Sequence, residues 1–176
     1  MLNSVRLAKL HKWEDVANET GFKVETYLGS STIPEAGLGR FVATDIKKGD
    51  IVRVQKIGDK TLECYASETD MAARIARDGI QYLEYFGHTG PQARPETRDL
   101  VFVNNPPLYS NHCTGAAKNI ETVWDGDVKY IRATRDISPG EELMEDYRSF
   151  GEVGWFEAFL VLDGRVPVRQ LGEMLG

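Results

Sequence analysis

Two polar clusters in the second half of the chain carry residue types that could act together on a bound molecule. Asn111 and His112 are adjacent, and Tyr147 follows them after a patterned stretch of chain. A carboxamide, an imidazole and a phenol can each exchange hydrogen bonds with a ligand, and a phenol can also line an apolar slot. The stretch between them predicts a β-hairpin that turns at Asp125-Gly126. Such a hairpin would bring both clusters to one end of a sheet, and group transfer is the chemistry that they suggest.

The elements that would position the two clusters are short strands separated by turns. Alternating or clustered apolar residues predict strands over 22–28, 40–46, 51–57, 100–103, 120–124, 128–133 and 143–144. A series of short strands with many glycine and proline turns is typical of an antiparallel β fold. The sequence therefore predicts a mainly β fold class with helical additions.

Helical patterns occur at both ends of the chain and in its middle. A helix capped by Thr69 or Asp70 is expected to run to about Phe86, within an insert that covers about 60–99. An amphipathic pattern predicts an N-terminal helix over 1–21. The aromatic-rich segment 151–176 is expected to be a helical lid, which leaves 22–150 as the central domain.

The composition excludes several classes of protein. A length of 176 residues fits one domain, and 41% hydrophobic with 27% charged residues is typical of a globular chain. No apolar run is long enough to span a bilayer and the N-terminus carries no signal-peptide core, so an intracellular protein without a membrane partner is expected. The formal net charge of −6 disfavours a nucleic-acid ligand and favours basic partners.

The metal-ligating residue types do not predict a metal site. Cys64 and Cys113 are too few for a disulfide framework and lack the spacing of a zinc site, and the three histidines are scattered. Cys113 stands beside His112, which raises the alternative of a thiol hydrolase. Neighbours in sequence seldom form a nucleophile–base pair, because such pairs meet through the fold. This alternative is therefore the weaker one.

Gly37 and Gly39 flank Leu38 in a loop that is rich in small residues. A dinucleotide-binding loop needs a third glycine, where this chain has Val42, and then a helix, where a strand is expected. Two interpretations remain. The glycines either permit a turn with positive φ, or their missing side chains let a ligand lie against the backbone.

Taken in order, these segments resemble the SET-domain protein lysine methyltransferases over most of the central domain. The segment 37–51 resembles the family's opening motif of Gly-x-Gly, a strand and a glycine turn. Asn111-His112 resembles its Asn-His-Ser-Cys element, and the segment 135–147 resembles its closing motif. The resemblance implies a SET-domain fold, a β-clip with a knot-like centre through which the closing strand passes.

The resemblance also implies roles for single residues. The residues expected to hold S-adenosylmethionine are Gly37, Leu38, Gly39, Asn111, His112, Tyr147 and Phe156. Tyr147 would also be the catalytic tyrosine at the base of a channel for the substrate lysine. Tyr109 and Trp155 are expected to line this channel, since aromatic walls suit a methylated ammonium.

The chain departs from the family pattern at several positions. Cys113 follows His112 directly, without the family's serine, and the next expected asparagine is displaced to Asn119. Glu145 stands where many members have Phe or Tyr, a position linked to the number of methyl groups added. No cysteine follows Tyr147, so no zinc-binding cap is expected and the aromatic helix would replace it.

The implied function is that of an S-adenosylmethionine-dependent protein-lysine N-methyltransferase. Its substrate would be a basic protein segment, with histone tails as the first expectation and the nucleus favoured over the cytoplasm. The alternative from another class is a catalytically silent SET-like module that binds a peptide or a partner protein.

Overall fold

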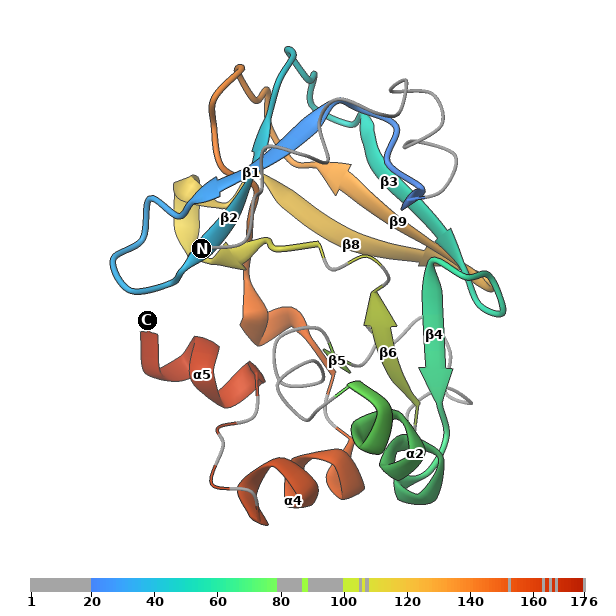
Figure 1. Ribbon diagram of the computed structural model, residues 1–176. Coiled ribbons are helices and arrows are strands. Elements are labelled where there is room, and N and C mark those ends of the chain that lie inside the picture. Colours follow the sequence, from blue (N-terminus) through green and yellow to red (C-terminus); the bar gives the residue numbers. More distant parts are fainter. Residues whose placement is uncertain are drawn as a thin grey trace.

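The computed structural model describes residues 20–78, 87–88, 100–104, 106, 108–151, 153–162, 164, 166 and 168–175. Its elements are mostly short strands in small sheets, with the helices α2, α4 and α5 gathered at one end (Figure 1). This arrangement confirms the mainly β fold class with helical additions. Among these residues, no helix combines the length and the apolar character that crossing a membrane requires.

One antiparallel sheet contains the hairpin that the sequence predicts. Its three strands have the order β3 (Ile51–Lys56), β9 (Val128–Ala133) and β8 (Ile120–Asp125). The last register pair before the turn joins Asp125 to Val128. Gly126 has φ 56°, a left-handed conformation that glycine adopts without steric cost. The Asp-Gly signal thus identified the turn correctly.

A second hairpin carries the glycine loop. It consists of β1 (Thr26–Ser30) and β2 (Leu38–Val42), which pair antiparallel. The strand expected at 22–28 begins later, because Phe22 turns into the core and bridges to Arg53 instead. The strand expected at 40–46 begins earlier and ends at Val42, before the turn that contains Gly49.

The insert forms a small sheet of its own. Its strand order is β4 (Leu62–Tyr65), β6 (Val101–Asn104) and β5 (Gly87–His88), and α2 (Glu68–Asp78) follows β4. The cap of α2 is Ser67, whose hydroxyl accepts from the Asp70 N–H at 3.2 Å and donates to the Asp70 carboxylate at 2.8 Å. The cap thus lies two to three residues before the Thr69 or Asp70 that the sequence predicted. Strand β4 was not predicted.

The closing segment is hydrogen-bonded on both sides. β7 (Asn111–His112) pairs parallel with β10 (Met144–Glu145), and on the other side β2 bonds to the residues that precede β10. The Leu143 N–H donates to the Arg40 carbonyl at 2.7 Å. A segment held between two others in this way is what the expected threading of the SET-domain fold requires.

The remaining elements follow β7 and β10. Short 3-10 turns lie at η3 (Gly115–Ala117) and η4 (Tyr147–Ser149). Two C-terminal helices, α4 (Gly154–Leu162) and α5 (Val168–Leu175), occupy the segment expected to be a helical lid. The expected N-terminal helix lies almost wholly outside the described residues, as does the part of the insert helix expected beyond Asp78.

Two clusters of buried side chains hold these elements together. The first joins the two hairpins to the closing segment: Phe22, Val42, Ile46, Val52, Leu108, Ile120, Ile131, Ala133, Ile137 and Leu143. The second joins the insert to α4: Met71, Val101, Val103, Val153 and Phe156. A fully buried aliphatic or aromatic side chain contributes about 1.5–3 kcal/mol of hydrophobic free energy. The first cluster contains Leu143, which directly precedes β10, and so anchors the closing segment to the two hairpins.

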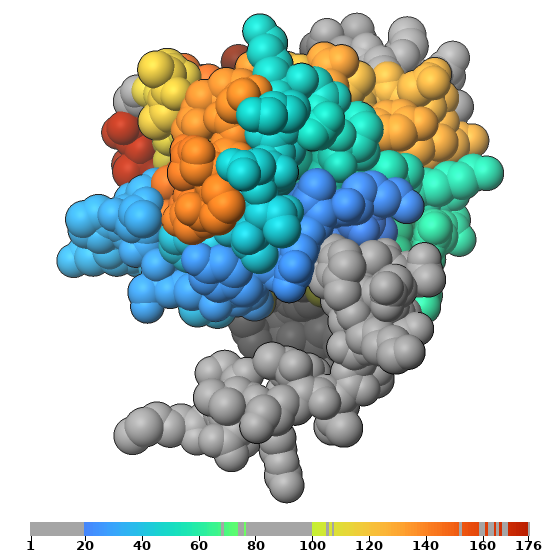
Figure 2. Space-filling view, turned by 90° about the horizontal axis from the view of Figure 1, so that it is seen from above, coloured from blue at the N-terminus to red at the C-terminus, as the bar shows by residue number. Residues whose placement is uncertain are grey.

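The closing motif also contacts the segment that follows β2. The buried Ile46 and Ile137 form an antiparallel bridge, and on the surface Lys47 pairs with Asp136 at 3.0 Å. Figure 2 shows the orange segment around 134–142 lying against the cyan segment around 43–50. The closing motif is thus attached along the hairpin that carries the glycine loop.

Candidate functional site

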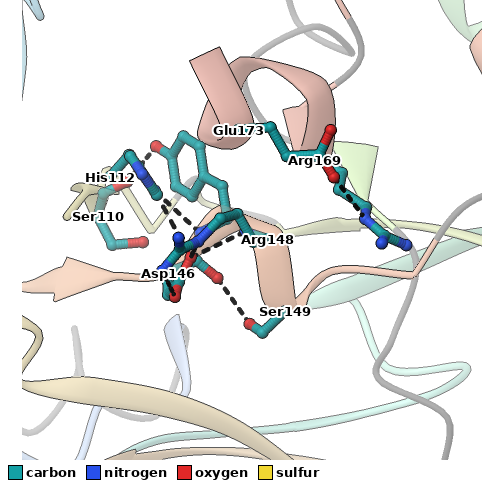
Figure 3. Close-up of polar contacts among 8 residues, drawn as sticks. Ser110, His112, Asp146, Arg148, Ser149, Arg169 and Glu173 are labelled. Carbon is teal, nitrogen blue, oxygen red and sulfur yellow. Dashed lines mark hydrogen bonds and ion pairs between the residues drawn. The ribbon is translucent and has the colours of Figure 1, made fainter. Parts of the chain in front are cut away.

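The parallel pairing of β7 with β10 brings the two polar clusters together. The Asn111 N–H donates to the Leu143 carbonyl at 3.3 Å, and the Cys113 N–H donates to the Glu145 carbonyl at 3.1 Å. Tyr147 follows β10 directly and begins η4. Figure 3 shows His112 and Ser110 facing the segment that contains Asp146 and Arg148. The two clusters do share one site, although strand pairing, and not the hairpin alone, joins them.

Tyr147 makes two hydrogen bonds to the other cluster. Its hydroxyl donates to the Ser110 carbonyl at 2.7 Å, and its N–H donates to His112 Nδ1 at 3.1 Å. Burial raises the pKa of the Tyr147 phenol well above its ordinary value, and the charges of Glu145 and Glu142 raise it further. The phenol is therefore neutral at physiological pH and remains a hydrogen-bond donor.

His112 is a buried, neutral imidazole. Burial lowers its pKa below the ordinary value and outweighs the opposing charge of Asp146. Because Nδ1 accepts the Tyr147 N–H, the ring proton belongs on Nε2. A hydrogen bond with the backbone of Gly172, on helix α5, opposes this lowering.

Helix α5 lies against η4, as Figure 3 shows for Arg169 and Glu173 above the Asp146 segment. A Cβ added to Gly172 would lie 2.9 Å from the Tyr147 Cβ and 3.1 Å from the Arg148 nitrogen. Only glycine lets this helix approach so closely. Helix α5 therefore brings the C-terminal segment against the candidate site.

Glu142 connects the closing segment to the glycine loop. Its carboxylate accepts from the Ser31 hydroxyl at 2.8 Å, the Thr32 N–H at 2.7 Å and the Thr32 hydroxyl at 2.6 Å. It also accepts from the Asn111 amide at 2.7 Å. Burial alone would raise its pKa, but these hydrogen bonds together hold the pKa below the ordinary value. Glu142 is therefore ionised, and it organises the loop and Asn111 around itself.

Gly37 and Gly39 are each glycine for a different physical reason. Gly37 has φ +74° and open space where a Cβ would stand, which fits both the turn and the exposed-backbone interpretations. A Cβ at Gly39 would lie 2.0 Å from Glu142 Oε1. Gly39 is thus a glycine because the carboxylate occupies the place of its side chain.

These geometries predict unequal effects of alanine at the two glycines. Gly39→Ala is expected to cost more than about 2 kcal/mol of unfolding free energy, because the Glu142 carboxylate must leave its donors. Gly37→Ala is expected to cost about 1 kcal/mol, the strain of a left-handed alanine. Urea unfolding of both variants measures the difference. Equal costs would contradict the contact between Gly39 and Glu142.

Asn119 holds the closing segment from the side opposite β2. Its side chain donates to the Glu142 carbonyl at 2.7 Å and accepts from the Met144 N–H at 2.8 Å. Its backbone N–H donates to the Met144 carbonyl at 3.1 Å. Asn119 is buried, so the displaced asparagine has a structural task here despite the longer loop before it.

The aromatic residues expected at the site have different positions. Tyr109 has φ 56°, and its carbonyl accepts the Arg40 N–H at 3.1 Å. Non-glycine residues in this conformation cost about 1–3 kcal/mol and cluster at functional sites. Phe156 belongs to the second core, and Trp155 packs against that core. Phe156 and Trp155 thus pack in the insert core, and this packing lends no support to the site roles expected for them.

Cys113 lacks the surroundings of a reactive thiol. Burial raises its pKa above the ordinary value, and the charge of Asp146 raises it further. The neighbouring His112 uses Nδ1 to accept the Tyr147 N–H. A protonated thiol beside an occupied imidazole gives no support to the thiol-hydrolase alternative.

Several site residues were missed by the sequence analysis. Ser31, Thr32 and Ser110 looked like ordinary loop residues, and Glu142 looked like part of a solvated acidic strand end. The one available signal was Gly39, because a required glycine implies a group that lies against it. Among the described residues, no group of three or more His, Cys, Asp or Glu side chains could hold a metal ion.

Comparison with known proteins identifies the family. A family model of the SET domain matches residues 37–148, which is more than half of the chain. The protein belongs to the SET-domain family. No curated protein sequence matches the chain.

The chain is also similar to solved structures. The Polycomb Repressive Complex 2 of Chaetomium thermophilum, in an autoinhibited conformation bound to S-adenosylmethionine, is 23% identical with a TM-score of 0.50. The match covers 80% of this chain and 17% of that one. The methyltransferase domain of human histone-lysine N-methyltransferase SETMAR is 18% identical with a TM-score of 0.49, covering 73% and 46% of the two chains. This chain therefore spans a small part of the Polycomb chains that it resembles.

The residues present fit S-adenosylmethionine, which carries a sulfonium, an ammonium, a carboxylate and an adenine. The ionised Glu142 beside the glycine loop suits cationic groups. The open space at Gly37 leaves backbone accessible, and the half-buried Asn111 amide lies at the same loop.

Proposed function

We propose that the protein is an S-adenosylmethionine-dependent protein-lysine N-methyltransferase that acts on a basic protein segment. The observation that carries this proposal is the hydrogen bond from the Tyr147 hydroxyl to the Ser110 carbonyl, next to the Asn111-His112 pair. The cofactor would supply a methyl group already activated on sulfur. The protein then needs to align the substrate amine more than it needs to activate the methyl group.

Each residue of the site has a task in this proposal. The Tyr147 hydroxyl donates a hydrogen bond to the Ser110 carbonyl, so the lone pairs of its oxygen remain able to accept a hydrogen bond from the substrate amine. Gly37, Leu38, Gly39, Asn111 and His112 would hold the cofactor around the ionised Glu142. Burial around Tyr147 excludes water and disfavours the ammonium form of the substrate lysine.

The charge of the protein supports a basic substrate. The formal net charge of −6 attracts cationic segments and speeds their encounter. Histone tails are the first candidate, and the SETMAR domain is itself described as a histone-lysine methyltransferase. With a histone as substrate, the protein would act in the nucleus.

The test is transfer of a labelled methyl group from S-adenosylmethionine to a panel of histones and basic peptides. We expect label on lysine, and none when that lysine is replaced by arginine. Calorimetry with the cofactor provides an independent measurement of binding. No binding at millimolar cofactor would contradict the proposal.

The silent-module alternative has one observation in its favour. The family's serine is missing after His112, and the loop that follows it forms the extra turn η3. The same experiment separates the two functions, since a silent module would bind the peptide and transfer no label.

A further inference from the structure

A buried polar layer lies beside the site and has no place in the chemistry described so far. In the register of the sheet, Lys129 on β9 stands between Gln55 on β3 and Trp124 on β8. The Lys129 ammonium nitrogen donates to Asn104 Oδ1 at 2.9 Å. Lys129 is 1% exposed and Asn104 is 5% exposed. Charged and polar side chains are rarely buried to this extent unless they are paired, so the layer calls for an explanation.

Glu145 connects this layer to the catalytic candidate Tyr147. It is 2% exposed, and its carboxylate accepts from the Thr122 hydroxyl at 2.6 Å and from the Ser110 hydroxyl at 3.3 Å. The carbonyl of the same Ser110 accepts the Tyr147 hydroxyl at 2.7 Å. Glu145 and Tyr147 therefore bond to the same residue, Glu145 to the hydroxyl of Ser110 and Tyr147 to its carbonyl.

The charged groups around Glu145 tune its affinity for a proton. Burial raises its pKa above the ordinary value, against the Thr122 hydrogen bond and the charges of Lys129 and Lys118. Burial also lowers the pKa of Lys129 to about 7, assisted by the positive charge of Arg53 and opposed by Glu145. The pKa of the buried carboxyl is thus raised and that of the buried amine lowered, so the protonation of each group depends on the other.

Methyl transfer requires that a proton leave the substrate. The side chain of a free lysine has a pKa of about 10.4, so at pH 7 almost every substrate amine is protonated. Its nitrogen lone pair can attack carbon only after the N–H bond breaks. A proton acceptor inside the site would make this deprotonation faster than release of the proton into bulk water.

We propose that Glu145 accepts the proton of the substrate ammonium through the Ser110 hydroxyl. This role rests on the proposed methyltransferase function. The ammonium N–H bond breaks, its proton passes to the Ser110 oxygen, and the Ser110 proton passes to the Glu145 carboxylate. The nitrogen lone pair then forms the new bond to the methyl carbon, and the electrons of the carbon–sulfur bond remain with sulfur.

The first experiment compares pH profiles of single-turnover methyl transfer to a basic peptide. Glu145→Gln keeps the shape of the side chain but accepts no proton. At pH 7 we expect the methyl-transfer rate of Glu145→Gln to fall about 100-fold, with the peptide KM little changed. This rate should recover as the pH rises toward the pKa of lysine. Glu121→Gln, which removes a half-buried carboxylate that pairs with Arg132, is the matched control and should behave as the wild type.

The second experiment measures the proton directly, without activity. The carboxyl carbon of Glu145 is followed by NMR in ¹³C-labelled protein and assigned by its absence from Glu145→Gln. We expect it to titrate above the ordinary range of a glutamate, and higher still in Lys129→Met, where the nearby cation is gone. An ordinary or lowered pKa for Glu145 would overturn the proposal.

The two experiments separate this role from the proposed function. A wild type that transfers methyl groups while Glu145→Gln shows a parallel pH profile would overturn the proton role alone. A wild type that binds no cofactor and labels no peptide would overturn the proposed function, and the proton role with it.

Discussion

Replacing Tyr147 with phenylalanine is expected to lower the rate of methyl transfer roughly 10²- to 10³-fold. Phenylalanine keeps the ring contacts with His112 and Phe150 but loses the hydroxyl that donates to the Ser110 carbonyl at 2.7 Å. The lost bond costs only about 1 kcal/mol of stability, so the variant should stay folded. Labelled methyl transfer measures the rate, and circular dichroism checks the fold.

Tyr130→Phe is the matched control for this experiment. It removes the same hydroxyl from a half-buried tyrosine on β9, a residue that takes no part in the site as described. Its rate should stay within about twofold of the wild type, since substitutions away from such features usually have small effects. Full activity of Tyr147→Phe would remove Tyr147 from catalysis.

Replacing Glu142 with alanine is expected to cost about 2–4 kcal/mol of unfolding free energy and to weaken cofactor binding more than tenfold. The carboxylate is 5% exposed and accepts four hydrogen bonds, from Ser31, from Asn111 and two from Thr32. Each hydrogen bond to a charged group contributes about 1.5–3 kcal/mol, although the effects within one cluster do not add fully. Urea unfolding and calorimetry with S-adenosylmethionine measure the two losses.

The adjacent Glu141 offers a control with the same chemistry. Its carboxylate is partly exposed and pairs with Arg135 at 2.8 Å. A surface pair of this kind contributes about 0–1 kcal/mol. A loss in Glu141→Ala as large as in Glu142→Ala would contradict the role of Glu142 as the organiser of the glycine loop.

The same carboxylate gives the stability of the protein a pH dependence. The pKa of Glu142 is lower in the folded protein than in the unfolded chain. Its contribution is therefore fully present above about pH 4.3, the ordinary value, and is lost as pH falls through the lower folded value. Acidification should destabilise the wild type more steeply than Glu142→Gln.

Some parts of the fold could be predicted because their signals are local. The Asp125-Gly126 turn was identified from two residues, since glycine alone adopts its left-handed backbone without steric cost. The order of the glycine loop, Asn111-His112 and Tyr147 along the chain also pointed to the SET-domain family, and the family model confirms it. These signals depend on residue types and short spacings, which any reader of the sequence can see.

The packing of the aromatic-rich helix α4 could not be predicted from local sequence signals. Its density of aromatic residues predicted a lid over the site, and Phe156 and Trp155 were chosen for that reason. The helix packs this part of its surface on the insert, among Met71 and Val103, while α5 touches η4. Which face a helix buries, and against what, depends on elements far away in the chain.

The closing motif shows most clearly which properties follow from the sequence and which depend on the tertiary structure. By itself, the sequence determined a family, a hairpin, a glycine loop at 37–39 and a tyrosine after an acidic run. Only the tertiary structure gave the two glutamates of that run opposite properties. Glu142 is ionised because Ser31, Thr32 and Asn111 converge on it, and the pKa of Glu145 is raised because burial beside Lys129 outweighs its hydrogen bonds. Hydrogen-bond donors and desolvation come from chain segments up to 111 residues apart, and no local spacing encodes them.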